Sequence, residues 1–66
     1  MEEKNTKMAK LAFIRKQRGY SQAKLAKACG WKQATISHYE SGERSPNIQK
    51  LKKIAEVLGV SIGDLI

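Results

Sequence analysis

The chain offers few of the side chains that carry catalysis or bind metals. It contains a single cysteine, Cys29, and a single histidine, His38. These two residues cannot supply the four Cys or His ligands of a structural zinc site, and a lone cysteine cannot form an internal disulfide. No serine, cysteine or acid stands at a recognisable spacing from His38 to make it a catalytic base. We therefore expect no enzyme activity, no metal and no cofactor, and we expect Cys29 to pack in the core.

Hydrogen-bonding chemistry is possible instead along residues 33–41. If this segment is helical, Ile36 and Tyr39 would face the core. The side chains left outward are then Gln33, Ala34, Ser37 and His38. Such side chains suit base edges, because glutamine bonds adenine through two hydrogen bonds, serine donates or accepts, and an alanine methyl can meet a thymine methyl. The same four residues would equally form an ordinary solvated helix face.

Positive charge dominates the composition and is concentrated in one half of the chain. The 66 residues include 13 Lys and Arg against 6 Asp and Glu, a net charge of +7. Residues 1–33 hold nine basic residues and two acids, whereas residues 34–66 hold four of each. This segregation favours a polyanionic partner, nucleic acid before an anionic membrane, although a basic N-terminal arm would give the same counts.

Length and apolar pattern limit the fold to one small domain. A chain of 66 residues buries only ~60% of its extended surface, too little for two cores or an enclosed enzyme cleft. It has no run of 18 apolar residues, and basic residues interrupt the stretch where a signal peptide would be apolar. The absence of a signal peptide and the unpaired Cys29 together predict a cytoplasmic protein. We expect one domain over residues 1–66, of which residues 1–5 form a flexible arm.

The apolar spacing is helical throughout, and glycine or proline interrupts it at short intervals. We expect an all-α bundle of five short helices over residues 6–18, 22–29, 33–41, 48–58 and from 61 onward. Ser61 and Asp64 have the spacing of a capping box that opens the last helix. The residues that end the first four helices would be Gly19, Gly30, Gly42 and Gly59. No segment alternates with a period of two, so we expect no sheet.

Residues 22–41 have the size of a helix-turn-helix unit, two helices joined by a turn with one glycine. Ala26 is small where the helices would cross closely, and Gly30 permits the sharp turn without a side-chain clash. Ile36 and Tyr39 would attach the second helix of the unit to the core. Its other face would then be free to enter a groove.

In these motifs the chain resembles the Cro/CI-type, or XRE, helix-turn-helix family, which includes the DNA-binding domains of lambda-type phage repressors. The matching pieces run in order over residues 8–66: residues 14–22 (IRKQRGYSQ), Leu25-Ala26, Cys29-Gly30, Ile36-Ser37, residues 39–42 (YESG) and, after Pro46, Leu51, Ile54-Ala55, residues 58–61 (LGVS) and Leu65. The resemblance implies a compact five-helix, lambda-repressor-like domain whose third helix reads the major groove.

The resemblance and the residue types together predict roles for individual positions. Base contacts would come from Gln33, Ala34, Ser37 and His38. Phosphate contacts would come from Ser21, Gln22, Lys32, Thr35 and Arg44. Gln22 and Gln33 match two glutamines that meet at the starts of the second and third helices, and Arg15 and Glu40 match a structural ion pair. Helix capping or plain surface exposure is the alternative role of Ser21, Gln22 and Arg44.

Three positions depart from the family pattern. Trp31 stands where a smaller aliphatic residue is usual, and we expect it to pack rather than to stack on bases. Lys32 replaces the usual Ser or Thr cap and places a cation at a positive helix end, so we interpret it as a phosphate contact. Ala34 replaces a residue that often hydrogen-bonds, so the family's sequence preference does not transfer. The lysines expected on the solvent face of the fourth helix are Lys50, Lys52 and Lys53.

The resemblance implies a sequence-specific transcriptional regulator, usually a repressor, bound to a two-fold symmetric operator of double-stranded DNA. One recognition helix reads only a few base pairs, so we expect a homodimer at least on DNA, with neither a membrane nor a small molecule as partner. The dimer surface would be the last helix, where core packing is the alternative role of Val60, Ile62, Leu65 and Ile66. An antitoxin or a restriction-modification controller would use the same domain. A basic helical module that docks on an acidic protein is the alternative from another class.

Overall fold

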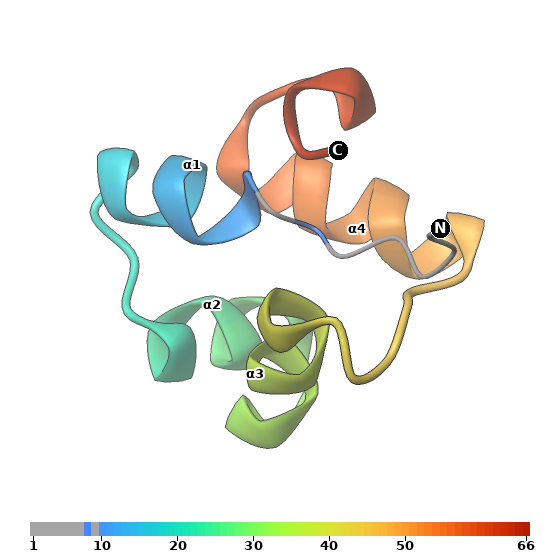
Figure 1. Ribbon diagram of the computed structural model, residues 1–66. Coiled ribbons are helices and arrows are strands. Elements are labelled where there is room, and N and C mark those ends of the chain that lie inside the picture. Colours follow the sequence, from blue (N-terminus) through green and yellow to red (C-terminus); the bar gives the residue numbers. More distant parts are fainter. Residues whose placement is uncertain (1–7, 9) are drawn as a thin grey trace.

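The computed structural model describes residue 8 and residues 10–66. Over this part the chain forms four α-helices and one 3₁₀ turn: α1 (Leu11–Gln17), α2 (Gln22–Cys29), α3 (Gln33–Ser41), α4 (Ile48–Leu58) and η1 (Ile62–Asp64). No strand occurs among these described residues. Figure 1 shows α2 and α3 together in the lower half of the molecule, with α1, α4 and η1 above them.

The expected bounds of α2, α3 and α4 are confirmed, and local signals explain why. The Ser21 hydroxyl accepts a hydrogen bond from the backbone N–H of Lys24 at 3.0 Å and so caps α2. Gly30 ends α2 in the left-handed region, at a φ of 82°, and the N–H of Trp31 donates to the carbonyl of Ala26 at 2.8 Å. This six-residue closure makes the turn short, so α3 starts close beside α2.

The first helix is shorter than expected. It begins at Leu11 rather than at residue 6, because Met8 is not helical and Lys10 occupies the N-cap without a side-chain hydrogen bond. A lysine cannot cap the free backbone N–H groups of a helix start, since its ammonium only donates. Residues 6 and 7, and the arm expected over residues 1–5, lie outside the described residues.

The prediction of a fifth α-helix is wrong, because η1 is a single 3₁₀ turn of three residues. The predicted capping box is present, and the backbone N–H of Ser61 donates to Asp64 Oδ2 at 3.2 Å. Gly63 lies inside the turn and disfavours helix by about 1 kcal/mol relative to alanine. One capped turn with a central glycine does not offset the cost of helix nucleation, and 3₁₀ geometry suits such short pieces.

The core lies between the two halves and takes one large aliphatic side chain from each element. Leu11, Leu25, Ile36 and Ile54 come from α1 to α4 in turn, and Leu65 follows η1; all five have 0% exposure. Truncating a buried residue of this kind typically costs 2–5 kcal/mol. Because Ile36 is locked into this core, the opposite side of α3 must face outward.

Candidate nucleic-acid interface

The outer face of α3 is open along its length. Ile36 and Tyr39 point into the core, with exposures of 0% and 4%. Gln33 and Ala34 are exposed at the start of the helix, and Ser37 and His38 are partly exposed further along. The structure therefore brings the four predicted base-contacting side chains onto one uncovered surface. We call this set of four residues the reading face.

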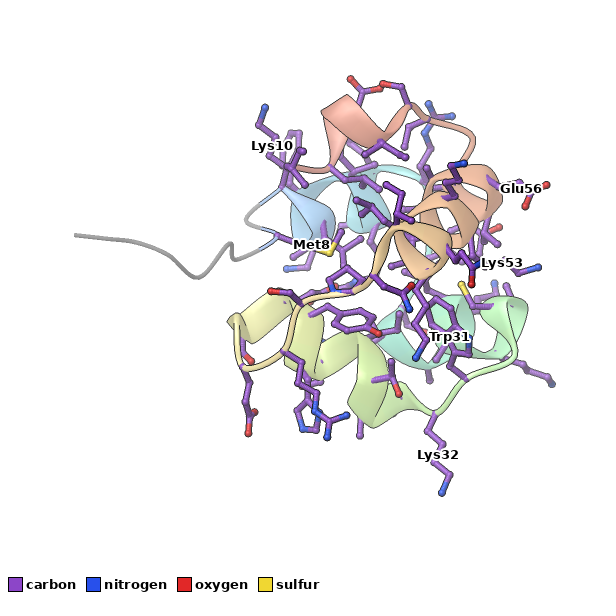
Figure 2. The ribbon with its side chains drawn as sticks, turned by 90° about the vertical axis from the view of Figure 1, so that its right-hand side faces the viewer. Met8, Lys10, Trp31, Lys32, Lys53 and Glu56 are labelled. Atoms are coloured by element: carbon purple, nitrogen blue, oxygen red, sulfur yellow. The ribbon has the colours of Figure 1, made fainter. Side chains whose placement is uncertain are left out.

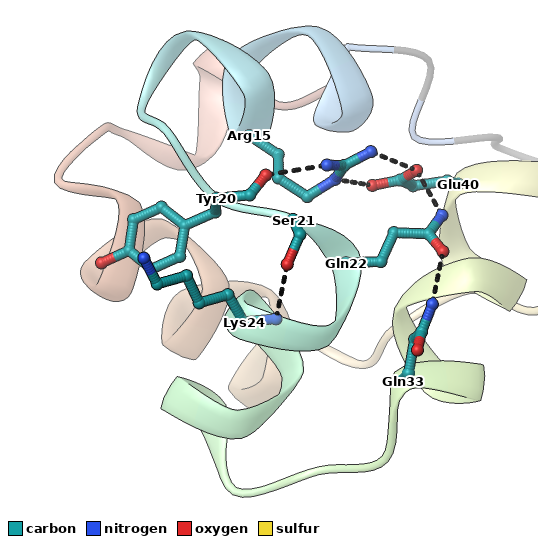
Figure 3. A network of polar contacts seen from close by, with 7 residues as sticks. All are labelled: Arg15, Tyr20, Ser21, Gln22, Lys24, Gln33 and Glu40. Carbon is teal, nitrogen blue, oxygen red and sulfur yellow. Dashed lines mark hydrogen bonds and ion pairs between the residues drawn. The ribbon is translucent and has the colours of Figure 1, made fainter.

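A buried ion pair joins α1 to the end of α3 (Figure 3). Arg15 Nε lies 2.6 Å from Glu40 Oε2, and Arg15 Nη2 donates to Glu40 Oε1 at 3.2 Å. Arg15 Nη1 donates to the carbonyl of Tyr20 at 2.8 Å. The two side chains are only 8% and 10% exposed, so this is the structural pair that the family resemblance implies. Its two parallel N–H···O contacts have the fork geometry that makes arginine–carboxylate pairs strong.

Two glutamines continue this network to the start of α3 (Figure 3). Gln22 Nε2 donates to Glu40 Oε1 at 2.9 Å, and Gln33 Nε2 donates to Gln22 Oε1 at 3.3 Å. A carboxylate only accepts, so Glu40 orients the Gln22 amide nitrogen toward itself and the Gln22 oxygen toward Gln33. We call the chain of contacts from Glu40 through Gln22 to Gln33 the amide relay. It turns the Gln33 amide nitrogen toward Gln22.

The predicted phosphate-contacting residues differ in how exposed they are to solvent. Ser21 and Arg44 are exposed, and Thr35 is half-buried on α3. Lys32 is exposed at the N-cap of α3, makes no capping bond, and projects away from the body of the protein in Figure 2. Gln22 is half-buried and takes part in the amide relay.

A second, exposed ion pair lies at the far end of the reading face. His38 Nε2 lies 3.7 Å from Glu43 Oε1, and the two side chains are 36% and 68% exposed. At this distance and exposure the carboxylate does not hold the imidazole in place. His38 therefore remains free to turn toward a ligand.

The four residues expected on a dimer surface are not equivalent. Leu65 has no exposed surface and belongs to the core, so it is removed from that surface. Val60 and Ile62 are partly buried and pack against the core, while Ile66 is 53% exposed. For Leu65 the structure thus supports core packing, the alternative role that the sequence left open.

Two contacts were not anticipated from the sequence, those of Asn47 and Lys50, and a third gives Trp31 its packing partner. Asn47 caps α4, accepting from the backbone N–H of Lys50 at 2.9 Å; an asparagine just before an apolar helix was the available signal. Trp31 packs as expected, with its ring perpendicular to that of Tyr39 at 6.3 Å between centroids. Lys50, expected only to face solvent, places its Nζ 5.9 Å from the centroid of the Trp31 ring.

Other kinds of site find little support in this part of the molecule. The described residues contain no group of three potential metal ligands, and none of the helices they form is long and apolar enough to cross a membrane. Cys29 is buried, and burial raises the pKa of its thiol against a smaller opposing effect of Lys53. A thiol with a raised pKa is a poor nucleophile, which fits a packing role.

Comparison with known proteins identifies the architecture. A family model described as helix-turn-helix matches residues 11–65. Antitoxin HipB of Escherichia coli O6:H1 is 36% identical over 52 residues, which cover 79% of this chain and 55% of that protein. An uncharacterised HTH-type transcriptional regulator, y4dJ of Sinorhizobium fredii, is 33% identical over 55 residues, covering 83% of this chain and 71% of that protein. The chain thus spans only about half the length of HipB.

Solved structures show the same arrangement. The DNA-binding domain of BldD superposes with a TM-score of 0.82 at 31% identity, over 100% of this chain and 99% of that one. Hydroxypropylphosphonic acid epoxidase from S. wedmorenis superposes with a TM-score of 0.78 at 33% identity, over 94% of this chain but 35% of the enzyme. The likeness to the epoxidase therefore concerns about a third of that protein.

Proposed function

This chain belongs to the helix-turn-helix family, and from that premise we propose that it regulates transcription by binding specific sites in double-stranded DNA. The observation that carries the proposal is the uncovered reading face of α3, supported from behind by Ile36 and Tyr39. An α-helix fits the major groove, where each base pair presents a distinct pattern of donors and acceptors. The likeness over the whole chain to the DNA-binding domain of BldD supports the same function.

The amide relay favours adenine as the base read by Gln33. Gln33 Nε2 uses one of its two N–H groups on Gln22, which leaves one N–H and the Oε1 oxygen for a ligand. Adenine offers the matching pair, an N7 acceptor and an N6 amino donor. Guanine presents two acceptors in the major groove, and a glutamine with one free N–H satisfies only one of them. The Gln33 amide is therefore matched to adenine before DNA arrives.

Cations beside the reading face would supply most of the affinity. Lys32 lies at the start of α3, and Arg44 lies in the loop after it; both are exposed. We assign them to phosphates, together with the hydroxyls of Ser21 and Thr35 and the amide of Gln22. Each neutralised phosphate releases counterions and steepens the loss of binding with salt by a slope of about −0.9.

We further propose that the protein acts as a homodimeric repressor on a two-fold symmetric operator in the cytoplasm. One reading face covers only a few base pairs, and two copies on half-sites ~34 Å apart would double the sequence read. We assign the contact between copies to Ile66, which is 53% exposed, with the partly buried Val60 and Ile62 beside it in the chain. Bound at a promoter, such a dimer would obstruct polymerase.

Selection of bound duplexes from a random pool tests this function. We expect enriched sites with two-fold symmetry and an adenine at the position read by Gln33. Gln33→Ala should lose most of the preference for that adenine, a discrimination of about 1–3 kcal/mol, while its affinity for random DNA changes little. Gln49→Ala is the matched control, because Gln49 is exposed on α4. If no duplex outcompetes bulk DNA, the alternative of a basic protein-docking module takes its place.

The similarity to HipB favours an antitoxin as the second candidate function. An antitoxin would use the same DNA-binding surface and would in addition neutralise a toxin protein. Depleting the protein from its host distinguishes the two functions. Growth arrest that is relieved by deleting a second gene would support the antitoxin, whereas unchanged growth with altered transcription would support a regulator alone.

A further inference from the structure

Trp31 and Lys50 form a contact between the helix-turn-helix turn and the first turn of α4. Lys50 Nζ lies over the Trp31 ring, 5.9 Å from its centroid. The Trp31 ring meets Tyr39 edge-on, and Tyr39 is only 4% exposed, so the tryptophan is anchored on the core side. Ring faces attract ammonium groups at this range through their quadrupole. The ring thus gives a flexible lysine a preferred position.

That position is close to the start of the recognition helix. Trp31 directly precedes Lys32, the N-cap residue of α3. In Figure 2 Trp31 lies between α4 and α3, and Lys32 projects from the N-terminal end of α3 below it. The contact therefore places a cation of α4 5.9 Å from the ring of the residue that precedes the N-cap of the recognition helix.

Among the described residues, no carboxylate forms an ion pair with Lys50. The ion pairs among the described residues that include α3 or its following loop are Arg15–Glu40 and His38–Glu43, and neither involves Lys50. A cation in the first turn of a helix is also unfavourable toward the helix dipole, so helix stability does not explain it. An ammonium over a ring keeps its full charge and has N–H donors left over. It is therefore available to an anion outside the chain.

We propose that Lys50, positioned by Trp31, is a further phosphate-contacting residue that extends the DNA interface from the start of α3 onto α4. This inference rests on the proposed DNA-binding function. The phosphate that Lys50 contacts would lie near the start of α3, next to the phosphate assigned to Lys32. Trp31 is the positioning residue, and it contacts the lysine rather than a base.

The salt dependence of binding tests the role of Lys50. The probe is a labelled random-sequence duplex of about 20 base pairs, two half-sites in length, with affinity measured by anisotropy between about 50 and 200 mM salt. Lys50→Ala should make the plot of log affinity against log salt concentration less steep by about 0.9. The loss of affinity relative to wild type should therefore be about 3.5-fold smaller at the high-salt end of this range than at the low-salt end. Lys52→Ala is the matched control, since Lys52 is exposed on the same helix about 200° further around its axis.

The outcomes separate this inference from the proposed function. If the wild-type protein binds no duplex, both fail. If it binds, and Lys32→Ala lowers the slope while Lys50→Ala behaves like Lys52→Ala, the DNA-binding function stands and the role of Lys50 is refuted. If Lys50→Ala lowers the salt dependence of binding and Lys52→Ala does not, the inference is supported.

The role of Trp31 needs a separate measurement. In a Trp31→Phe background, which keeps an aromatic ring, Lys50→Ala should still lower the slope. In a Trp31→Leu background, Lys50→Ala should lower the slope by less than half as much, because no ring is present to position the Lys50 ammonium. Circular dichroism melts of each variant identify a loss of folding. An undiminished effect of Lys50→Ala in folded Trp31→Leu protein would show that Trp31 does not position it.

Discussion

The two ion pairs of α3 differ in almost every physical respect. Arg15 and Glu40 are about nine-tenths buried and 2.6 Å apart, whereas His38 and Glu43 are 36% and 68% exposed and 3.7 Å apart. Low exposure makes the first pair costly to break, and solvent makes the second weak. The comparison shows how one short helix is both anchored and able to adapt. Its first turn presents an amide held by the buried pair, and its last turn carries an imidazole free to move.

Breaking the buried pair should have the largest effect. We expect Arg15→Ala to lower the free energy of unfolding by about 3–5 kcal/mol, because it leaves the Glu40 carboxylate buried without its cation. Urea denaturation measures the change. Arg18→Ala is the control, since Arg18 is exposed and follows α1 by one residue, and it should stay within about 0.5 kcal/mol of wild type. A similar stability for both variants would mean that the buried Arg15–Glu40 pair contributes no more to folding than an exposed arginine does.

Replacing both partners separates stability from positioning. The double variant Arg15→Met and Glu40→Leu should recover most of the stability lost in Arg15→Ala, because apolar pairs of similar volume often replace buried ion pairs without cost. It should lose the preference for adenine, since the amide relay begins at Glu40. A double variant that keeps this preference would show that Gln33 needs no support from Glu40.

Removing the middle of the amide relay should have an intermediate effect. Gln22→Ala leaves the Gln33 amide free to rotate, and we expect the preference for adenine to fall by roughly fivefold, equivalent to about 1 kcal/mol for one hydrogen bond. The free energy of unfolding should change by less than about 1 kcal/mol, because Gln22 is only half-buried. Competition between an adenine site and its substituted counterpart measures the first quantity. Gln17→Ala, an exposed glutamine at the end of α1, should leave both unchanged.

Breaking the exposed pair should have the smallest effect on stability. Glu43→Gln should change the free energy of unfolding by less than about 0.5 kcal/mol. It should raise the affinity for duplex DNA slightly, by less than tenfold, because it removes a negative charge beside His38. A marked loss of stability would assign the His38–Glu43 pair a structural role and remove the contrast with Arg15–Glu40.

Much of the helix-turn-helix unit could be predicted because its signals are local. Ser21 marks the start of α2, Gly30 its end, and the spacing of Ile36 and Tyr39 sets which side of α3 is buried. The outer parts were predicted less well. The start of α1 lacks a capping side chain, and the segment after Ser61 forms only a turn because Gly63 weakens an already short helix. Where local signals are weak, packing decides the conformation.

The amino-acid sequence by itself determined the bounds of α2, α3 and α4 and which side of each one is apolar, since caps, glycines and residue spacing act within a few positions along the chain. Only the tertiary structure decided which polar atoms meet. The orientation of the Gln33 amide depends on Glu40 and Gln22, and the place of the Lys50 ammonium depends on Trp31, 19 positions away in the chain. Such contacts depend on how the helices cross, and the spacing of residues within one helix does not specify that geometry.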